Sequence, residues 1–576
     1  MKHTIRKSAI ALAAAAMLVL TGCGTALQET VPAASNVESQ ASENSSEATA
    51  NAIYADKLFD ASYVHQIDIT ISDADWSDLT ENPMNKTKYE VAVSIDGETI
   101  ESVSFATKGN TSLSSVAGDP DSDRYSFKVN FGKYVDGQTY YGLNKLNLNN
   151  LYADATFMKD YISYEIFRQA GVAAPLTSYV WLTVNGKAQG LYLAIEDISE
   201  SYLTRTNDGE GELYKPETDH LDNVGKMGGD QLQPPQNDGQ PPQMPDGERP
   251  TPPEGADFAD RTPPEGMERP ELPENGEMPE APGDGKMPDR GGMPFGESSN
   301  GADLAYSDDS IESYSDIFEN DETDADDAAK QRVIAALKGL SEGTDLESCL
   351  DTDEVIRYFA AHNFVLNYDS YTGNMLHNYY LYEKDGKLSM LPWDYNLAFG
   401  GFASGHGKDS TDDATALVNT GIDTPLSGTD ASARPMWAWI TENADYLAQY
   451  HQVYDELLTS YFASGAFAGQ IDSLYEMLLP YIEKDTGAFY DAEAFQAGYA
   501  ALKQFCLLRA ESIRAQLDGT LSSDTAQQDT DKQIPATDIR IAAMGTHGGG
   551  AEGRFPDAGR APRRESDAEN RQKETS

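Results

Sequence analysis

The stretch Tyr379-Tyr-Leu-Tyr-Glu-Lys-Asp-Gly-Lys-Leu-Ser-Met-Leu-Pro-Trp-Asp394 contains two strand-forming runs on either side of an Asp-Gly pair. An Asp-Gly pair between two such runs is typical of a tight β-hairpin turn. A turn centred between Asp385 and Gly386 places Asp394 opposite residue 377, only three positions after Asn374. The hairpin therefore returns Asp394 to the segment that precedes it.

A helix is expected just before this hairpin, because Asp351 and Glu354 form a start like a capping box and an apolar face follows. A polar loop, residues 367–374, joins the helix to the hairpin. Hairpin closure then gathers Asp369, Asn374 and Asp394 at one end of the ribbon. Two carboxylates and an amide suit Mg²⁺, which takes one or two carboxylates plus substrate phosphates. The alternative is that these are turn-forming residues of an exposed hairpin.

The order of Asp-x4-Asn, hairpin and Asp matches that of the catalytic-loop Asp, metal-binding Asn and second metal-binding Asp in protein kinases. The segment upstream offers what a kinase needs on its other lobe. Lys108, Gly109, Asn110, Thr111 and Ser112 lie between expected strands, where backbone N–H groups and hydroxyls can cover phosphates. This loop is a weak signal by itself, because many loops share its composition.

A strand, a helix and a hairpin follow that loop. Lys128 lies on a strand and is the candidate phosphate lysine, although a solvated strand lysine is the simpler interpretation. A helix is expected from Asp154 to Gly171, and its Glu165 is placed to pair with Lys128, with a surface role as the alternative. The hairpin around Asn185-Gly186 ends at Glu196, next to the expected adenine-binding hinge.

Composition and the N-terminal sequence indicate the compartment and the class of partner. The chain has 576 residues with a formal charge of -53, which disfavours nucleic acid as a partner. A basic start and a short apolar run precede Leu20-Thr-Gly-Cys23, which predicts a signal peptide over 1–22 and a lipid anchor on Cys23, with an ordinary secretory signal as the alternative. The protein is then expected outside the cytoplasm, anchored to a bacterial cell membrane.

Composition also divides the rest of the chain. Residues 23–52 read as a flexible tether, and 16 of the 28 prolines fall between Pro234 and Pro294, inside a predicted disordered insertion over 218–330. The tail, 521–576, is predicted to be disordered as well. Two blocks remain, a strand-rich lobe over 53–217 and a mostly helical lobe over 331–520. We therefore expect a two-lobed α+β protein.

Six segments together resemble the spore coat protein H (CotH) kinase family. They are Lys-Gly-Asn-Thr-Ser (108–112), Ser-Phe-Lys-Val (126–129), Val-Asn-Gly-x3-Gly-Leu-Tyr-Leu-x-Ile-Glu (184–196), Asn-Tyr-Asp-Ser-Tyr-x-Gly-Asn (367–374), His-Asn-Tyr-Tyr-Leu-Tyr (377–382) and Leu-Pro-Trp-Asp-Tyr-Asn-x-Ala-Phe-Gly (391–400). The resemblance spans roughly 60–520.

The resemblance implies an atypical protein-kinase-like fold that binds ATP with Mg²⁺ and phosphorylates Ser or Thr of protein partners or of itself. It implies that Asp369 is the catalytic-loop Asp, Asn374 a metal ligand, Asp394 the metal-binding Asp and Lys128 the phosphate lysine. Many members carry a second Asp where this chain has Asn396, which leaves the number of metals open and makes Asn378 a candidate extra ligand. The competing hypothesis is a catalytically idle surface adhesion or scaffold lipoprotein, and a glycan-binding domain is a weaker third.

Overall fold

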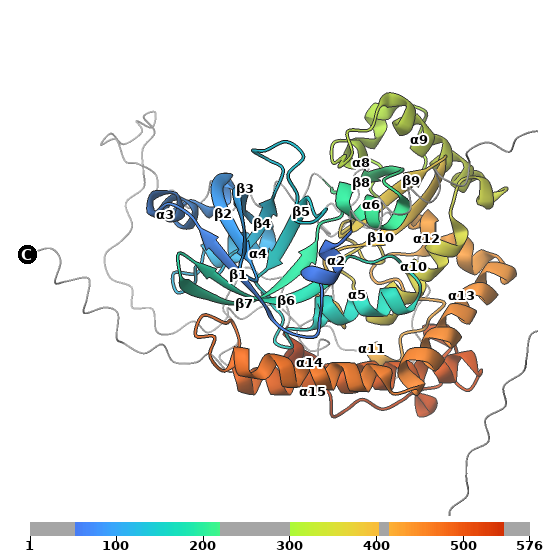
Figure 1. The fold of residues 1–576 in the computed structure, drawn as a ribbon. Coiled ribbons are helices and arrows are strands. Elements are labelled where there is room, and N and C mark those ends of the chain that lie inside the picture. The colour runs from blue at the N-terminus through green and yellow to red at the C-terminus, as the bar shows by residue number, and fades with distance from the viewer. Residues whose placement is uncertain (1–51, 219–299, 403–413, 546–576) are drawn as a thin grey trace, which may run out of the picture. The chain divides into compact units, whose positions relative to one another are not determined.

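The computed structural model describes residues 52–218, 300–402 and 414–545 (Figure 1). The predicted signal peptide with Cys23, nearly all of the tether, most of the insertion and the end of the tail lie outside these residues. The described part is a mixed α/β body that is strand-rich towards its N-terminus and helical towards its C-terminus, as the sequence predicts.

Seven strands of the N-terminal part form a closed barrel in the order β1-β2-β3-β4-β5-β7-β6. The predicted antiparallel hairpin around Asp96-Gly97 is confirmed as β2 and β3. The barrel closes where β1 pairs in parallel with β6, a long-range contact that the sequence pattern did not predict. The strands are β1 (His65–Thr70), β2 (Tyr89–Ile95), β3 (Glu98–Lys108), β4 (Ser126–Asn130), β5 (Lys145–Asn149), β6 (Thr177–Val184) and β7 (Lys187–Glu196).

Alternate side chains of these strands fill the barrel, and Ile67, Val93, Phe105, Phe127 and Leu182 are fully buried there. This inward alternation is the reason that the period-two pattern of the sequence predicts the strands correctly.

Short helices lie before, between and after the barrel strands, and one of them begins later than expected. Asp154 is buried and accepts hydrogen bonds from the backbone of Thr156 and Lys159, so the chain makes a turn before the helix starts. The prediction of a helix starting at Asp154 is therefore wrong by five residues. The helices are α2 (Tyr54–Lys57), α3 (Asp73–Glu81), η1 (Pro83–Asn85), α4 (Thr111–Ala117), α5 (Lys159–Gln169) and α6 (Glu200–Asn207).

A separate three-stranded sheet has the order β10-β9-β8, with β8 (Glu212–Tyr214), β9 (Tyr379–Lys384) and β10 (Lys387–Pro392). The predicted hairpin register is confirmed, because Lys384 faces Lys387 and Tyr379 faces Pro392. Strand β8 comes from the block predicted as the N-terminal lobe, yet it pairs with β9. The end of that block thus belongs to the hairpin sheet.

The remaining elements are helical. They are η2 (Ile311–Tyr314), α8 (Ser315–Phe318), α9 (Asp327–Glu342), η3 (Leu346–Ser348), α10 (Thr352–Val365), α11 (Ala414–Val418), η4 (Ala431–Ala433), α12 (Pro435–Glu442), α13 (Ala444–Leu457), η5 (Leu458–Ala463), α14 (Ala466–Ile482), α15 (Ala492–Leu517), η6 (Thr525–Gln527), η7 (Thr530–Lys532) and η8 (Ile541–Met544). The sequence predicts that the chain is helical almost throughout after Pro435, and the succession of α12, α13, η5, α14 and α15 confirms this.

Parts of the two segments predicted to be disordered, 218–330 and 521–576, are folded. Residues 300–330 fold into η2, α8 and the first turn of α9, where Asp326 caps the helix by accepting from the Ala329 backbone. Residues 521–545 also fold, with Ile541 and Met544 buried. Both segments are polar overall, which is why the sequence predicted disorder. A few apolar side chains are nevertheless enough to hold such a segment against an existing core.

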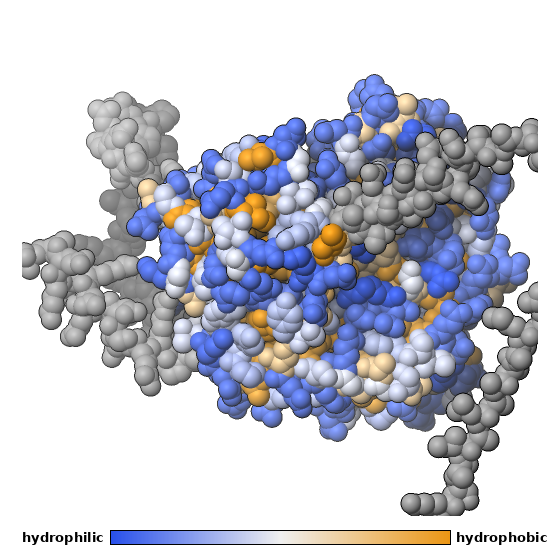
Figure 2. All heavy atoms as spheres, viewed as in Figure 1, coloured by the Kyte–Doolittle hydropathy of each residue, from blue (hydrophilic) through white to orange (hydrophobic). Residues whose placement is uncertain are grey.

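One large core joins α5, the hairpin sheet and the C-terminal helices. The face of the molecule shown in Figure 2 is predominantly hydrophilic, with apolar atoms in small separate groups. Across the described residues, none of the helices combines the length and apolar character needed to cross a bilayer.

A buried ion pair fastens the C-terminal helices to the barrel. Arg124, next to β4, lies 2.9 Å from Asp485, which follows α14, and the two side chains are 3% and 2% exposed. Arg124 also donates to the Gln189 carbonyl, and Asp485 accepts from the Leu191 backbone at 2.8 Å. A Cβ on Gly190 would lie 2.2 Å from Asp485, so only glycine permits this approach.

We predict that Asp485→Ala lowers the free energy of unfolding by about 3–5 kcal/mol, because it leaves the Arg124 charge buried without a partner. The measurement is the midpoint of thermal unfolding by circular dichroism. Asp472→Ala serves as the control, since Asp472 pairs with Lys503 at a more exposed position and should cost less than about 1 kcal/mol. Equal destabilisation by both variants would contradict the role assigned to the buried pair.

Candidate active site

The loop between α10 and β9 brings Asp369 to the end of the hairpin, as the sequence predicts. Helix α10 begins at the predicted cap, where Asp351 accepts a hydrogen bond from the Glu354 backbone. Further along, Asp369 Oδ1 lies 2.8 Å from His377 Nε2, and the Asn378 amide donates to the Asp369 carbonyl at 2.8 Å and to Oδ2 at 3.2 Å. His377 is the position expected to face Asp394. The hairpin end therefore holds Asp369 by two neighbouring side chains.

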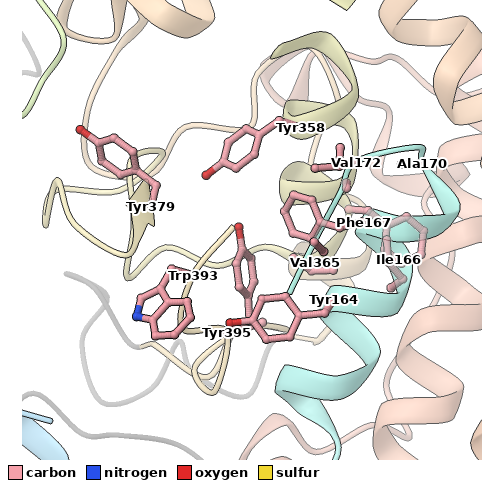
Figure 3. Close-up of a cluster of buried hydrophobic side chains, with 14 of the residues drawn as sticks. Tyr164, Ile166, Phe167, Ala170, Val172, Tyr358, Val365, Tyr379, Trp393 and Tyr395 are labelled. Atoms are coloured by element: carbon pink, nitrogen blue, oxygen red, sulfur yellow. The ribbon is translucent and has the colours of Figure 1, made fainter. Parts of the chain in front are cut away.

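Asp394 has a left-handed backbone, with φ of 55°, which is uncommon outside glycine. Its N–H donates to the Tyr164 hydroxyl oxygen at 3.1 Å, and its carbonyl accepts from the Asn367 amide at 3.1 Å. The next N–H, that of Tyr395, donates to Asp160 Oδ1 at 2.7 Å. Figure 3 shows Tyr164 of α5 beside Tyr395 and Trp393 of the loop after β10. Helix α5 thus fixes the backbone that carries Asp394.

Asp160 was not predicted as a site residue. Its side chain is almost fully buried, and burial together with the nearby Asp394 charge raises its pKa to about 7. Burial also raises the pKa of Asp394; the Asp369 charge adds to the rise and Lys108 opposes it. Asp160 and Tyr164 stand four residues apart on one helical face, a spacing that the sequence shows but that does not reveal their target. The site therefore contains two interacting carboxylates.

Two lysines reach this region from the barrel. Lys108, at the end of β3, donates to Asn149 Oδ1 at 2.8 Å, and its ammonium lies 5.5 Å from the centre of the Trp393 ring. Burial lowers the pKa of Lys108 to about 8, helped by the charges of Lys128 and Lys215 and opposed by Asp394. Lys108 is thus electrostatically coupled to the metal candidate.

Lys128 is paired with Asp197, not with Glu165. Its ammonium lies 2.9 Å from Asp197 Oδ2, which also accepts from the Asn147 amide at 2.8 Å. Burial opposes the charged form of both partners, but their mutual attraction outweighs it, lowering the pKa of Asp197 and raising that of Lys128. The strand register explains this pairing. Lys128 faces Asn147 on the next strand, and Asn147 faces Ile195, two residues before Asp197.

Two predicted site residues have other partners. Glu165 pairs with Arg168 at 3.0 Å, one turn along α5, so the expected Lys128–Glu165 ion pair is wrong. Glu196 is fully buried, lies 2.6 Å from Arg205 and accepts from the Tyr54 hydroxyl. We therefore revise the role of Glu196 from contacting nucleotide to holding the end of β7.

The expected phosphate-covering loop is shorter than predicted. Gly109 has a φ of +99°, and a Cβ there would lie 2.9 Å from Ser112 Oγ. Asn110 precedes α4, so Thr111 and Ser112 form the first turn of a helix. The predicted role of these residues in nucleotide binding stays a prediction.

Asn374 and Asn378 differ in their surroundings. Asn378 contacts Asp369 directly, whereas Asn374 is exposed and its amide faces Gly428, where a Cβ would approach Nδ2 to 2.5 Å. Their predicted roles as metal ligands stay predictions, but the structure places Asn378 closer to the catalytic candidate.

The sequence comparisons agree with this arrangement. A family described as CotH kinase protein matches residues 105–252 and 268–513, which is well over half of the chain. This chain belongs to the CotH family. The match includes Lys108, Lys128, Asp160, Asp369 and Asp394.

Two curated CotH relatives come from Bacillus subtilis (strain 168). Inner spore coat protein H is 20% identical over 402 residues, covering 69% of this chain and 84% of that protein. Inner spore coat protein H-like protein is 33% identical over 75 residues, covering 13% of this chain and 23% of that protein. The first relative therefore aligns with most of the CotH body.

The donor set of this CotH protein fits a magnesium ion that takes part of its coordination from a substrate. Within residues 52–218, 300–402 and 414–545, no three His, Cys, Asp or Glu side chains gather as a metal cage. The Asp394 charge nevertheless adds to the effect of burial in raising the pKa of Asp160, and a divalent cation would offset both carboxylate charges. Mg²⁺ typically binds one or two carboxylates and completes its shell with phosphates and water.

We predict that Asp160→Asn stabilises the metal-free CotH protein at pH 8, because the amide keeps an acceptor for the Tyr395 N–H without the charge. The folded pKa of about 7 exceeds the ordinary value of 3.8, so stability is lost as pH rises through this interval. The gain should reach about 2–4 kcal/mol above pH 7 and vanish near pH 4.

The measurement is thermal unfolding in EDTA across pH 4–8. Asp353→Asn is the matched control, because Asp353 is 68% exposed on α10 and should show no comparable pH dependence. A gain from Asp160→Asn that is the same at every pH would contradict the carboxylate repulsion.

Proposed function

We propose that this CotH protein is an atypical protein kinase that transfers the γ-phosphoryl group of ATP, with Mg²⁺, to Ser or Thr of a protein substrate or of itself. One observation supports the proposal most directly. Asp369 and Asp394 lie at the hairpin end, and Lys108 and Lys128 of the barrel lie in the same region. Phosphoryl transfer depends mainly on such positioning and charge neutralisation. In this proposal the barrel and the helical part correspond to the two lobes of a kinase-like fold.

The side chains divide the work between them. Lys108 and Lys128 neutralise phosphate oxygens, and Asp197 holds the Lys128 ammonium in place at 2.9 Å. Asp394, with Asp160 behind it, provides oxygen ligands for Mg²⁺, which when bound would offset negative charge on the phosphates. Tyr164 and Asp160 of α5 keep the Asp394 backbone fixed.

Asp369 is the candidate acceptor for the proton of the attacking hydroxyl. Its side chain is 13% exposed, so an approaching hydroxyl can reach it. His377 and Asn378 hold Oδ1 and Oδ2 respectively, which fixes the direction of the remaining lone pairs. This orientation is what general-base catalysis requires.

We predict that Asp394→Asn reduces phosphate transfer from labelled ATP by at least about 100-fold, because it removes the carboxylate charge that would hold Mg²⁺ at the site. The measurement is Mg²⁺-dependent incorporation into the purified protein and into added Ser/Thr peptides, with circular dichroism confirming the fold. Asp353→Asn, which removes an exposed carboxylate, should retain full transfer. Unchanged transfer by Asp394→Asn would remove the assignment, and absence of transfer by the wild-type protein would favour an idle scaffold.

The N-terminal motif supports a membrane-anchored location. Leu20-Thr-Gly-Cys23 follows an apolar run and a basic start, which is the pattern of an acylated cysteine in bacterial lipoproteins. We therefore propose that the kinase domain is displayed outside the cytoplasm on a lipid anchor.

We predict that Cys23→Ser moves the protein from the membrane fraction to the soluble fraction, because the acyl chains provide the membrane affinity. The measurement is fractionation of expressing cells with an antibody against the folded domain. Ser45→Ala in the following segment is the control and should stay in the membrane fraction. Membrane retention of Cys23→Ser would contradict the anchor.

A further inference from the structure

We propose that Lys215 is a third phosphate-binding lysine of the site and that it contacts the terminal phosphate of a nucleoside triphosphate. This inference rests on the proposed function and names a residue that sequence reasoning did not assign. It follows from where Lys215 lies, what holds it and which charges surround it.

Lys215 lies at the same end of the hairpin sheet as Asp394. Strand β8 pairs with β9 so that Tyr214 faces Leu381, and Lys215 is the next residue, beside Tyr380. On the other edge, β10 ends at Pro392 opposite Tyr379, two residues before Asp394. The Tyr380 and Trp393 rings pack edge to face at 5.5 Å, which ties the central strand β9 to the loop that carries Asp394.

The backbone around Lys215 is held on both sides. The Lys215 N–H donates to the Asn320 carbonyl at 2.9 Å, and the Glu217 N–H donates to the Asp316 carbonyl at 3.0 Å. Among the residues that the structure describes, the ammonium pairs with Glu217, two residues away, and the two side chains are 26% and 33% exposed. A partly exposed pair of this kind is weak. Lys215 is thus firmly placed while its charge remains available to a ligand.

Two lysine ammonium groups act on the metal candidate Asp394, and a third acts on one of these lysines. The charges of Lys108 and Lys215 both lower the pKa of Asp394, and those of Lys128 and Lys215 both lower that of Lys108, besides the effects of burial. Lys108 donates to a neutral amide oxygen, so this hydrogen bond does not neutralise its positive charge as one to a carboxylate would. Cations crowded together in this way suit a ligand with several adjacent negative charges, such as a polyphosphate.

The position of Lys215 indicates which phosphate it meets. Lys108 and Lys128 approach from the barrel, whereas Lys215 directly follows β8, at the end of the sheet where the loops that carry Asp369 and Asp394 adjoin β9 and β10. The group to be transferred must lie beside Asp369. The sheet lysine is therefore assigned to the terminal phosphate, and the barrel lysines to the phosphates nearer the nucleoside.

The test measures the binding of ATP, ADP and inorganic tripolyphosphate to the purified protein by calorimetry in Mg²⁺. Lys215→Met should weaken ATP binding at least tenfold and ADP binding less than threefold, and Lys215→Arg should recover part of the loss. Glu217→Gln should tighten ATP binding, because it removes the competitor for the ammonium. Lys384→Met is the matched control, since Lys384 lies at the turn end of the same sheet and should leave binding unchanged.

Each outcome separates the two proposals. Wild-type-like ATP binding by Lys215→Met, or equal weakening by the Lys215 and Glu217 variants, would overturn the inference and reduce the pair to a structural role. Equal loss for ATP and ADP would overturn the assignment to the terminal phosphate. If the wild-type protein binds neither nucleotide, the proposed function fails. Tripolyphosphate binding that depends on Lys215 would then still support a polyphosphate site, and its absence would end both.

Discussion

Two hydrogen bonds from helix α5 to the loop after β10 hold the candidate site in shape. Asp394 adopts a left-handed backbone that a non-glycine residue keeps only when its surroundings enforce it. The Tyr164 hydroxyl and the Asp160 carboxylate supply that constraint by accepting from two successive N–H groups. The hairpin alone would bring Asp394 near Asp369, but α5 sets the direction in which its carboxylate points.

The candidate site contains a group of positively charged lysines, although the chain as a whole is strongly negative. The protein carries a formal charge of -53, which on average repels an anionic ligand. Lys108, Lys128 and Lys215 counter this locally, and two of them stand on the barrel while the third stands on the sheet. A polyphosphate bound between them would therefore bridge the two parts of the body, which makes the junction, and not either part alone, the binding unit.

The sequence predicted the β9–β10 hairpin and its register because both depend on contacts between residues close in the chain. An Asp-Gly turn and two runs of strand-forming residues fix the pairing of Tyr379 with Pro392. The partner of Lys128 was missed because it depends on the order of strands in the barrel, in which β5 pairs with both β4 and β7. Glu165 faces its own helical neighbour Arg168 instead. Asp160 was missed because nothing local distinguishes a carboxylate that caps a distant loop from one on a helix surface.

The barrel and the helical part are joined by more than the site itself. Arg124 and Asp485 form a buried ion pair, and each also bonds to the backbone around Gly190 in β7. Breaking this contact to open the junction would leave two charges without their partners. The free energy required is larger than ordinary thermal fluctuations provide. Movements that admit a nucleotide must therefore occur in loops such as that around Gly109, and not by separation of the two parts. In that case the lysines and carboxylates stand at nearly fixed distances before the ligand arrives, and binding loses little free energy to reorganisation.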